Sequence, residues 1–314
     1  MKKLFSIILP IYGNEKNLPV TIPYIIEHLN LFENYNIEII MVNDGSPDNS
    51  WEIMKDYQKK YPKLIRLAGL TRNFGQSAAM RCGMDMAKGD VIGIISADLQ
   101  DPFELFAEML EAWEQGSKLV IATRQDREEK GIGAFCSKLF HRIIKKHVNK
   151  KYPKGGFDFF LMDREVNDKY RSLDKVPSSL QLLLLWLGYD YKEIKYVRKE
   201  RKIGKSGYNF ASKVDVAIRM FVSWTDFPIK MILFSGILLS MLGLICCLVD
   251  AILFFAISID VYMILDIVFV FAVFTGLILA AIGVVGEYIW RMFELNKQYP
   301  RYLVGEEVNG NGLE

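Results

Sequence analysis

The stretch that decides the fold is the apolar run Val91–Ile95 followed by Ser96-Ala97-Asp98-Leu99-Gln100-Asp101-Pro102. A short apolar run of this kind is typical of a buried strand, and a helix-like segment follows it. The Asp and Gln oxygens that alternate at the end of the strand are ligands that a hard cation prefers. The stretch therefore predicts a metal-and-phosphate site, or else an ordinary turn in which Asp101 or a neighbour caps a helix.

Strand-like and helix-like runs alternate on both sides of this stretch. The alternation predicts an α/β fold with a mostly parallel sheet that is covered on both faces. Because right-handed crossovers place the strand ends along one rim, three polar segments should converge there, at 10–15, 43–46 and 98–101. The expected strands are 5–11, 37–42, 65–70, 91–95 and 118–122, and the expected helices are 18–31, 51–61 and 78–87.

Three loops offer groups for a nucleotide-bearing ligand. Glu15, in the segment 10–15, could accept a hydrogen bond from a base or ribose, and so could Asp44 in the segment 43–48. Each loop taken alone is an ordinary connection between a strand and a helix. The segment 72–79 adds a cation, amides and a small-residue helix start suited to a phosphate. It lacks the P-loop lysine pattern, which argues against ATP hydrolysis.

The composition argues against a nucleic-acid-binding protein and against a zinc protein. The chain has 314 residues and a formal net charge of +2, which argues against a general nucleic-acid-binding surface. Its four cysteines and three histidines have no metal-type spacing, so zinc chemistry is not expected. Cysteine usage fits a reducing, cytosolic setting. The short apolar run after Met1 reads as a first core strand and not as a signal peptide.

The C-terminal third contains two long uncharged apolar runs, 231–249 and 267–285, joined by a short connector. Each is long enough to span a bilayer, and together they predict a transmembrane hairpin. Lys230 precedes the first run and Arg291 follows the second, so the positive-inside rule places both ends of the hairpin, and with them both termini, in the cytoplasm. The alternative is a pair of buried helices in a soluble core.

The chain is thereby expected to be an integral membrane protein with four parts. Residues 1–200 form the cytoplasmic α/β domain, and 201–228 form a loop and an amphipathic helix at the membrane interface. Residues 229–289 form the two transmembrane helices, and 290–314 form a cytoplasmic C-terminal tail. Glycines in the apolar runs permit close helix packing, which would allow a homo-oligomer.

Six ordered blocks, together with the terminal hairpin, resemble the GT-A-fold family 2 glycosyltransferases. The resemblance is closest to the membrane-anchored polyprenyl-phosphate enzymes related to dolichol-phosphate mannose synthase and bactoprenol glucosyltransferase. It implies that residues 1–200 form a GT-A catalytic domain, which transfers a sugar with inversion from a nucleotide-sugar to the phosphate of a polyprenyl lipid, with Mg²⁺ or Mn²⁺ as cofactor. The blocks are 10–15, 42–46, 72–75, 97–102, 156–164 and 201–208.

The resemblance also implies roles for individual residues. Asp98 and Gln100 match the metal positions, and Asp98 thereby serves catalysis. Asp158 matches the position of a catalytic base or acceptor-orienting acid. Donor binding is implied for Pro10, Tyr12, Glu15, Asp44, Arg72, Ser96, Ala97, Arg201, Ser206 and Tyr208.

Two arginines follow the expected strand at 118–122. The guanidinium groups of Arg124 and Arg127 suit bidentate contacts to an acceptor phosphate. The alternative is a solvated charged loop over 124–130.

One position departs from the family pattern, because the first acid of the Asp-x-Asp pair is Ser96. The change predicts weaker or altered metal binding if that position faces the metal, or an altered donor preference if it faces the ribose or sugar. It also motivates the alternative of a catalytically silent nucleotide-sugar-binding scaffold. A polysaccharide synthase is the other alternative, although two spans provide little material for a polymer channel and there is no Gln-x-x-Arg-Trp block.

Overall fold

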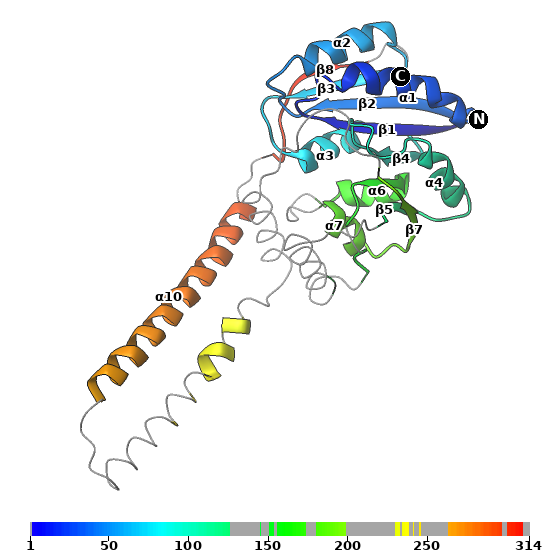
Figure 1. Ribbon diagram of the computed structural model, residues 1–314. Coiled ribbons are helices and arrows are strands. Elements are labelled where there is room, and N and C mark those ends of the chain that lie inside the picture. The colour runs from blue at the N-terminus through cyan, green and yellow to red at the C-terminus, as the bar shows by residue number, and fades with distance from the viewer. Residues whose placement is uncertain are drawn as a thin grey trace. The chain divides into compact units, whose positions relative to one another are not determined.

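The computed structural model describes residues 2–125, 151–153, 156–173, 180–198, 263–296 and 300–309, with residue 145 and short stretches between 230 and 245 (Figure 1). The chain divides into two compact units. The first unit comprises Met1–Lys213 and Tyr299–Glu314, and the second comprises Val214–Gln298.

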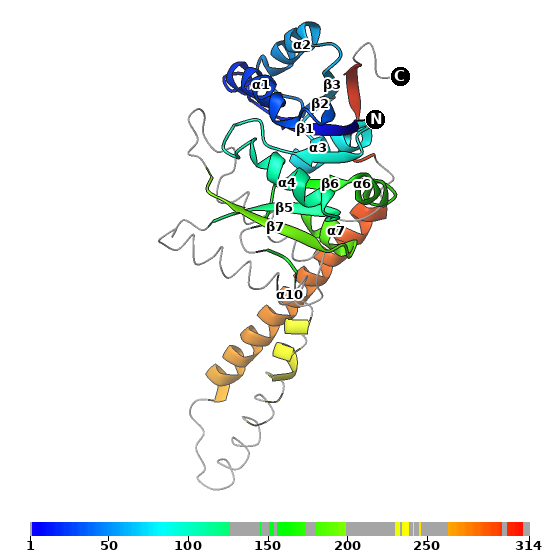
Figure 2. The same ribbon diagram turned by 90° about the vertical axis from the view of Figure 1, so that its right-hand side faces the viewer.

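Within the described residues, the first unit is built on one eight-stranded sheet of order β7-β5-β6-β4-β1-β2-β3-β8 (Figures 1 and 2). The α/β fold and all five expected strands are confirmed. The strands are β1 (Lys3–Ile11), β2 (Tyr35–Asn43), β3 (Ile65–Leu70), β4 (Val91–Ile94), β5 (Leu119–Arg124), β6 (Phe159–Asp163), β7 (Tyr191–Tyr196) and β8 (Val304–Val308).

The three expected helices are present with slightly different ends. The first of them ends earlier than expected and continues as a 3₁₀ helix. The helices of this unit are α1 (Leu18–Glu27), η1 (His28–Phe32), α2 (Ser50–Lys60), α3 (Gln76–Met86), α4 (Leu105–Glu114), α6 (Arg164–Arg171) and α7 (Leu180–Trp186).

Six of the eight strands run in the same direction, so the sheet is mostly parallel as expected, and β6 and β8 are the exceptions. The pairings β1–β2, β1–β4, β2–β3 and β5–β7 are parallel, whereas β4–β6, β5–β6 and β3–β8 are antiparallel. Because β6 runs against its neighbours β4 and β5, its first residue lies at the edge where those two strands end. This reversal brings the segment before β6 to the same rim as the loops after β1, β2 and β4.

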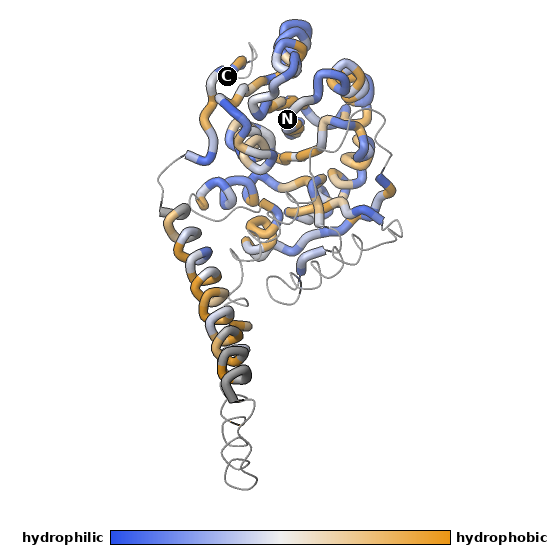
Figure 3. The backbone as a smooth tube through the Cα atoms, turned by 60° about the vertical axis from the view of Figure 1, so that its left-hand side comes forward, coloured by the Kyte–Doolittle hydropathy of each residue, from blue (hydrophilic) through white to orange (hydrophobic). Residues whose placement is uncertain are grey.

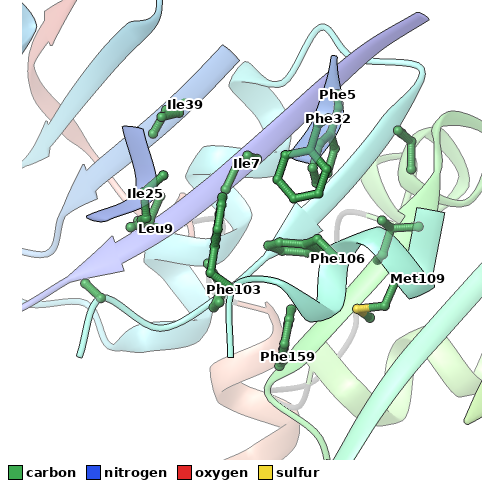
Figure 4. Close-up of a cluster of buried hydrophobic side chains, with 14 of the residues drawn as sticks. Phe5, Ile7, Leu9, Ile25, Phe32, Ile39, Phe103, Phe106, Met109 and Phe159 are labelled. Carbon is green, nitrogen blue, oxygen red and sulfur yellow. The ribbon is translucent and has the colours of Figure 1, made fainter. Parts of the chain in front are cut away.

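Alternate residues of β1 face two different layers, as expected for a strand buried on both sides. Phe5 belongs to a cluster with residues of α1, α2 and α4 (Figure 4). In this cluster the Phe106 ring centroid lies 5.2 Å from that of Phe5 and 4.8 Å from that of Phe159. A Cβ atom at Gly93 would lie 2.4 Å from Phe106, so the glycine makes room for the ring. On the opposite face Ile8 packs directly against Gly83 of α3.

A fully buried carboxylate, that of Glu38 in β2, lies inside the sheet unit. Arg66 Nη1 donates to Glu38 Oε2 at 3.1 Å and to the Met86 carbonyl at 2.7 Å. The other carboxylate oxygen accepts from Ser6 Oγ and from the Lys88 backbone N–H, both at 2.6 Å. Every charge in this pair is therefore compensated by a partner, as a buried ion pair requires.

The segment 290–314, expected as a C-terminal tail, contributes strand β8, which lies along the edge of the sheet beside β3. The Thr71 N–H donates to the Leu303 carbonyl at 3.0 Å, and Trp51 Nε1 donates to Glu306 Oε2 at 3.0 Å. The strand covers the edge of β3, which would otherwise present unpaired backbone groups.

The described part of the second unit is dominated by the 34-residue helix α10 (Met263–Asn296), which is largely hydrophobic (Figure 3). Its segment Val273–Trp290 has a mean hydropathy of 1.8, and it is the one helix among the described residues that is long and apolar enough to cross a membrane. The helix extends beyond the expected boundary at 289. The other expected span, 231–249, lies mostly outside the described residues, and those of its residues that are described are helical.

Candidate active site

The loops after β1 and β2 are joined by hydrogen bonds from backbone to side chain. The Gly13 N–H donates to Ser46 Oγ at 3.1 Å, and the Asn14 N–H donates to Ser50 Oγ at 3.0 Å. The Glu15 N–H donates to Asp48 Oδ2 at 3.0 Å. These bonds hold the loops as one polar edge, as the convergence of the strand ends predicted.

Asp44 connects this edge to the loop after β3. Its carboxylate is buried and accepts from the Phe74 N–H at 2.7 Å and from the Gly75 N–H at 2.9 Å. Burial raises the pKa of Asp44, and the two amide hydrogen bonds oppose that rise. The neighbouring Gly45 has a φ of +62°, and a Cβ there would lie 2.4 Å from the Arg72 carbonyl carbon. A glycine is required where the two loops meet this closely.

The other expected donor residues of these loops lie at the same edge. Tyr12 is half exposed, and the Glu15 carboxylate accepts from Asn49. The Arg72 guanidinium lies 4.2 Å from the centroid of the Phe74 ring, a cation–π contact that gives this long side chain a defined direction.

The loop after β4 gathers three oxygen-bearing side chains. Ser96 Oγ lies 2.8 Å from Asp98 Oδ1 and 2.8 Å from Asp101 Oδ2. The Gln100 backbone N–H also donates to Asp98 Oδ1, at 3.3 Å. We call Ser96, Asp98 and Asp101 the acid cluster. A second carboxylate is thus present beside Ser96, although the chain lacks the first acid of the family pair.

Local backbone geometry supports this arrangement. Leu99 has a φ of 54°, in the left-handed region, so the chain folds back between Asp98 and Asp101. Ala97, one of the residues expected to bind the nucleotide-sugar, is buried. Its methyl group cannot form a hydrogen bond, but its carbonyl accepts one from Thr21 Oγ1 of α1 at 2.9 Å. The alternative interpretation of Asp101 as a helix cap is wrong, because the residue preceding α4 is Glu104 and no side chain caps that helix.

Asp158 stands immediately before β6, at the rim to which the reversal of that strand brings it. Arg124 Nη2 lies 3.4 Å from Asp158 Oδ2, and Gln181 Nε2 of α7 donates to Asp158 Oδ1 at 2.9 Å. Two of the expected acceptor-side residues, the carboxylate and an arginine, are therefore in contact with each other.

Two residues at and after the end of β7 belong to the site, although neither was expected from the sequence. The Tyr196 hydroxyl donates to Asp101 Oδ1 at 2.5 Å and interacts with the Arg124 guanidinium. Burial and the charge of Asp101 raise the pKa of Tyr196. Arg198 Nε lies 3.2 Å from Asp101 Oδ1, and its Nη2 lies 4.0 Å from Asp98 Oδ2. A Tyr-x-Arg pair ahead of the block at 201–208 was the only signal available in the sequence.

The remaining candidates divide into two groups. Pro10 lies near the end of β1, opposite Val42 and beyond the last residue paired with β4, where its missing N–H leaves that ladder intact. The other four expected site residues lie outside the described part of the chain: Arg127, Arg201, Ser206 and Tyr208.

Comparison with known proteins identifies the family. Residues 6–171 match the model of Glycosyl transferase family 2. The chain is a family 2 glycosyltransferase. The resemblance found in the sequence blocks is thereby confirmed, and so is the expectation of an enzyme.

Relatives of this family 2 glycosyltransferase are similar over nearly their whole length. The bactoprenol glucosyl transferase of Shigella phage SfII is 30% identical over 310 residues, which cover 98% of this chain and 99% of that protein. An uncharacterized glycosyltransferase, YkcC of Bacillus subtilis, is 31% identical over 301 residues, covering 96% of this chain and 93% of the relative.

Solved structures agree with the fold of this family 2 glycosyltransferase. The mannosyltransferase PcManGT of Pyrobaculum calidifontis, solved with GDP-Man and Mn²⁺, is similar with a TM-score of 0.51 and 17% identity, over 93% of this chain and 88% of that one. Glucosyl-3-phosphoglycerate synthase of Mycobacterium tuberculosis has a TM-score of 0.51 and 15% identity, over 70% of this chain and 78% of that one. The sheet is therefore of the GT-A type.

Proposed function

We propose that this glycosyltransferase transfers a sugar from a nucleotide-sugar to a polyprenyl phosphate, with inversion at the anomeric carbon, at the cytoplasmic face of the membrane. The observation that carries the proposal is the full-length similarity to a bactoprenol glucosyl transferase, which covers 98% of this chain and so includes its apolar C-terminal third. The name of that relative points to a lipid acceptor.

The donor side is assigned to the acid cluster and the loops beside it. The clustered oxygens of Ser96, Asp98 and Asp101 fit a hard divalent cation, Mg²⁺ or Mn²⁺, with Asp98 and Gln100 as the proposed ligands. When bound, such a cation stabilises the negative charge that develops on the leaving nucleoside diphosphate. Asp101 places a carboxylate beside Ser96, which supports retention of metal binding without the first family acid. The loops that carry Tyr12, Glu15, Asp44 and Arg72 would hold the nucleotide. Tyr12 and Glu15 expose polar groups at the rim, whereas Asp44 orients the loop of Arg72.

The acceptor side is assigned to Arg124 and Asp158. In the proposed reaction an oxygen of the lipid phosphate forms a bond to the anomeric carbon while the bond from that carbon to the diphosphate oxygen breaks. A phosphate is already anionic near neutral pH, so it needs orientation more than deprotonation. A guanidinium carries five N–H donors, so the contacts of Arg124 with Asp158 and Tyr196 leave donors for a phosphate. Asp158 would orient both the arginine and the acceptor.

The connectivity of the chain supports a membrane hairpin. Strands β3 and β8 pair in one sheet, yet the second unit, Val214–Gln298, lies between them in the sequence. If α10 crosses a membrane, the chain crosses it an even number of times, because the segments before and after that unit belong to one folded body. The proposal therefore assigns a second crossing to the apolar run 231–249 and leaves both termini in the cytoplasm.

Reporter fusions test this topology. Alkaline phosphatase, which is active only outside the cytoplasm, should be active when fused after residue 259 and inactive when fused after residue 314. Green fluorescent protein should give the opposite pattern at the same two sites. Phosphatase activity at the C-terminal fusion would contradict the even number of crossings and the hairpin with it.

The activity is tested with membranes from cells that express the full chain. Labelled UDP- and GDP-sugars are supplied one at a time with undecaprenyl or dolichyl phosphate and Mg²⁺ or Mn²⁺, and we expect label in an organic-soluble, acid-labile product. The same membranes without added prenyl phosphate serve as control. Label found only in polymer would favour a polysaccharide synthase, and no lipid product with any donor would contradict the proposal.

A further inference from the structure

The Tyr196 side chain lies between the two halves of the site: its hydroxyl donates to Asp101, and it interacts with the guanidinium of Arg124, the residue paired with it in the sheet. We propose that Tyr196 is a positioning residue that couples the acid cluster to Asp158 through Arg124. The inference rests on the proposed function, since it assigns the acid cluster to the donor and Asp158 to the acceptor. It adds a residue outside all six sequence blocks, together with a physical connection between the two substrates.

The sheet register explains why the connection exists. Tyr196 and Arg124 are paired residues of the parallel strands β7 and β5, and Ala122 of β5 pairs with Phe159, the residue after Asp158. Tyr196, Arg124 and Asp158 are therefore presented by three adjacent strands at one edge. Strand β4, whose loop carries Asp101, is separated from β7 by β5 and β6. The bond from Tyr196 to Asp101 thus links the two halves of this edge.

The chemistry of the phenol fits this bridge. A tyrosine hydroxyl has one proton to donate and lone pairs to accept with. The proton goes to Asp101 Oδ1 at 2.5 Å, so toward Arg124, which can only donate, the phenol oxygen offers its lone pairs. The tyrosine is only 7% exposed, and a hydroxyl buried to that degree needs partners.

On the donor side, Tyr196 holds the Asp101 carboxylate, and the position of that carboxylate determines which acceptor the Ser96 hydroxyl donates to. Asp101 is 2% exposed, with Oδ1 held by Tyr196 and Oδ2 at 2.8 Å from Ser96 Oγ. The serine hydroxyl also has a single proton, which it can donate to Asp101 or to Asp98 but not to both at once. The orientation of Asp101 therefore controls whether Asp98 receives that hydrogen bond or keeps the oxygen for a cation.

On the acceptor side, the same hydroxyl restrains Arg124. The side chains of Arg124 and Asp158 are 39% and 43% exposed, and an ion pair this exposed contributes little by itself. The interaction with the buried Tyr196 gives the guanidinium a second, shielded partner. Without it, Arg124 and Asp158 would keep their contact but lose their fixed place relative to the acid cluster.

The test compares Tyr196→Phe with Tyr191→Phe, which removes the same atom from the same strand. The Tyr191 hydroxyl donates to the exposed Lys151 carbonyl and touches neither half of the site. Tyr196→Phe should lower kcat about 10- to 100-fold while the donor KM changes less than about threefold, because alignment is lost and not donor affinity. Tyr191→Phe should stay within about twofold of the parent on both constants. Equal kcat values for the two variants would overturn the proposal.

A double-mutant cycle and a binding measurement separate coupling from a merely structural effect. Added to Arg124→Ala, Tyr196→Phe should lower kcat less than about threefold further, since the bridge is already broken. Full additivity of the two losses would contradict the coupling.

Mn²⁺ affinity, measured on purified full chain without substrates, gives a readout that survives failure of the proposed function. Both Tyr196→Phe and Arg124→Ala should change it by about three- to tenfold in the same direction, whereas Tyr191→Phe should not change it. If the parent chain made no lipid-linked sugar but these shifts appeared, the proposed acceptor would be wrong and the coupling right. Unchanged Mn²⁺ affinity in both variants would reject the coupling whatever the activity.

Discussion

Asp98→Ala should reduce sugar transfer at least about 100-fold, because the proposed divalent cation loses the carboxylate that holds it against the donor diphosphate. The loss should appear in kcat and in Mn²⁺ affinity together. Asp98 lies in the acid cluster, with its Oδ1 at 2.8 Å from Ser96 Oγ and its Oδ2 at 4.0 Å from Arg198 Nη2. The measurement is the initial rate of lipid-linked product at saturating donor over a range of Mn²⁺ concentrations.

Two control variants show whether the loss of activity in Asp98→Ala is specific to that carboxylate. Asp56→Ala removes an exposed carboxylate of α2 whose partner is Lys59, and it should leave the rate within about twofold. Asp98→Asn keeps the shape of the side chain and removes its charge, so it should lie close to the alanine variant if charge is what matters. An Asp98→Ala enzyme that kept most of its rate would exclude Asp98 as a metal ligand.

Arg66→Leu should lower the free energy of unfolding by about 3–5 kcal/mol, because it leaves the Glu38 carboxylate charged, buried and without its cation. The Glu38 side chain is 0% exposed and that of Arg66 is 10% exposed, so water cannot replace the lost partner. The same arginine also caps the Met86 carbonyl at the end of α3. Chemical unfolding of the detergent-solubilised chain, followed by tryptophan fluorescence, gives the comparison with the parent.

The matched control for Arg66→Leu is Lys118→Leu, which breaks a solvent-exposed pair with Glu165 in the same unit. Its effect should be no more than about 1 kcal/mol, since exposed ion pairs contribute little to stability. The double variant Arg66→Leu/Glu38→Leu should recover part of the loss, because it removes the uncompensated charge as well. Equal effects of Arg66→Leu and Lys118→Leu would show that the buried pair is not a major contributor.

The elements predicted correctly from the sequence share a local cause. The apolar runs of β1 to β5 and the turn residues after them carry their signals within a few positions, so a strand, its end and its polar loop could be predicted together. Strand β6 was not predicted, because it is inserted between β4 and β5 by the packing of the whole sheet and not by a local signal. Strand β8, Val304–Val308, carries two glutamates and joins the sheet only through the exposed edge of β3.

The expected site residues show the same division. The sequence determined the family and the polar rim, because βα connections force the ends of parallel strands to one edge. The hydrogen bonds of Asp101 and the bridge of Tyr196 could not be predicted, since that tyrosine and its partner are 95 residues apart in the sequence.

The sequence by itself thus determined an α/β glycosyltransferase with its polar loops on one rim and a hydrophobic C-terminal third, because hydrophobic periodicity and turn chemistry are local properties. Only the tertiary structure decided that Asp101 stands beside Ser96, that Asp158 meets Arg124 and that the chain returns after α10 to complete the sheet. The last two of these contacts join segments distant in sequence, whereas Asp101 reaches Ser96 through the left-handed turn at Leu99. The positions of those two contacts follow from strand order and direction, which the packing of the whole sheet determines.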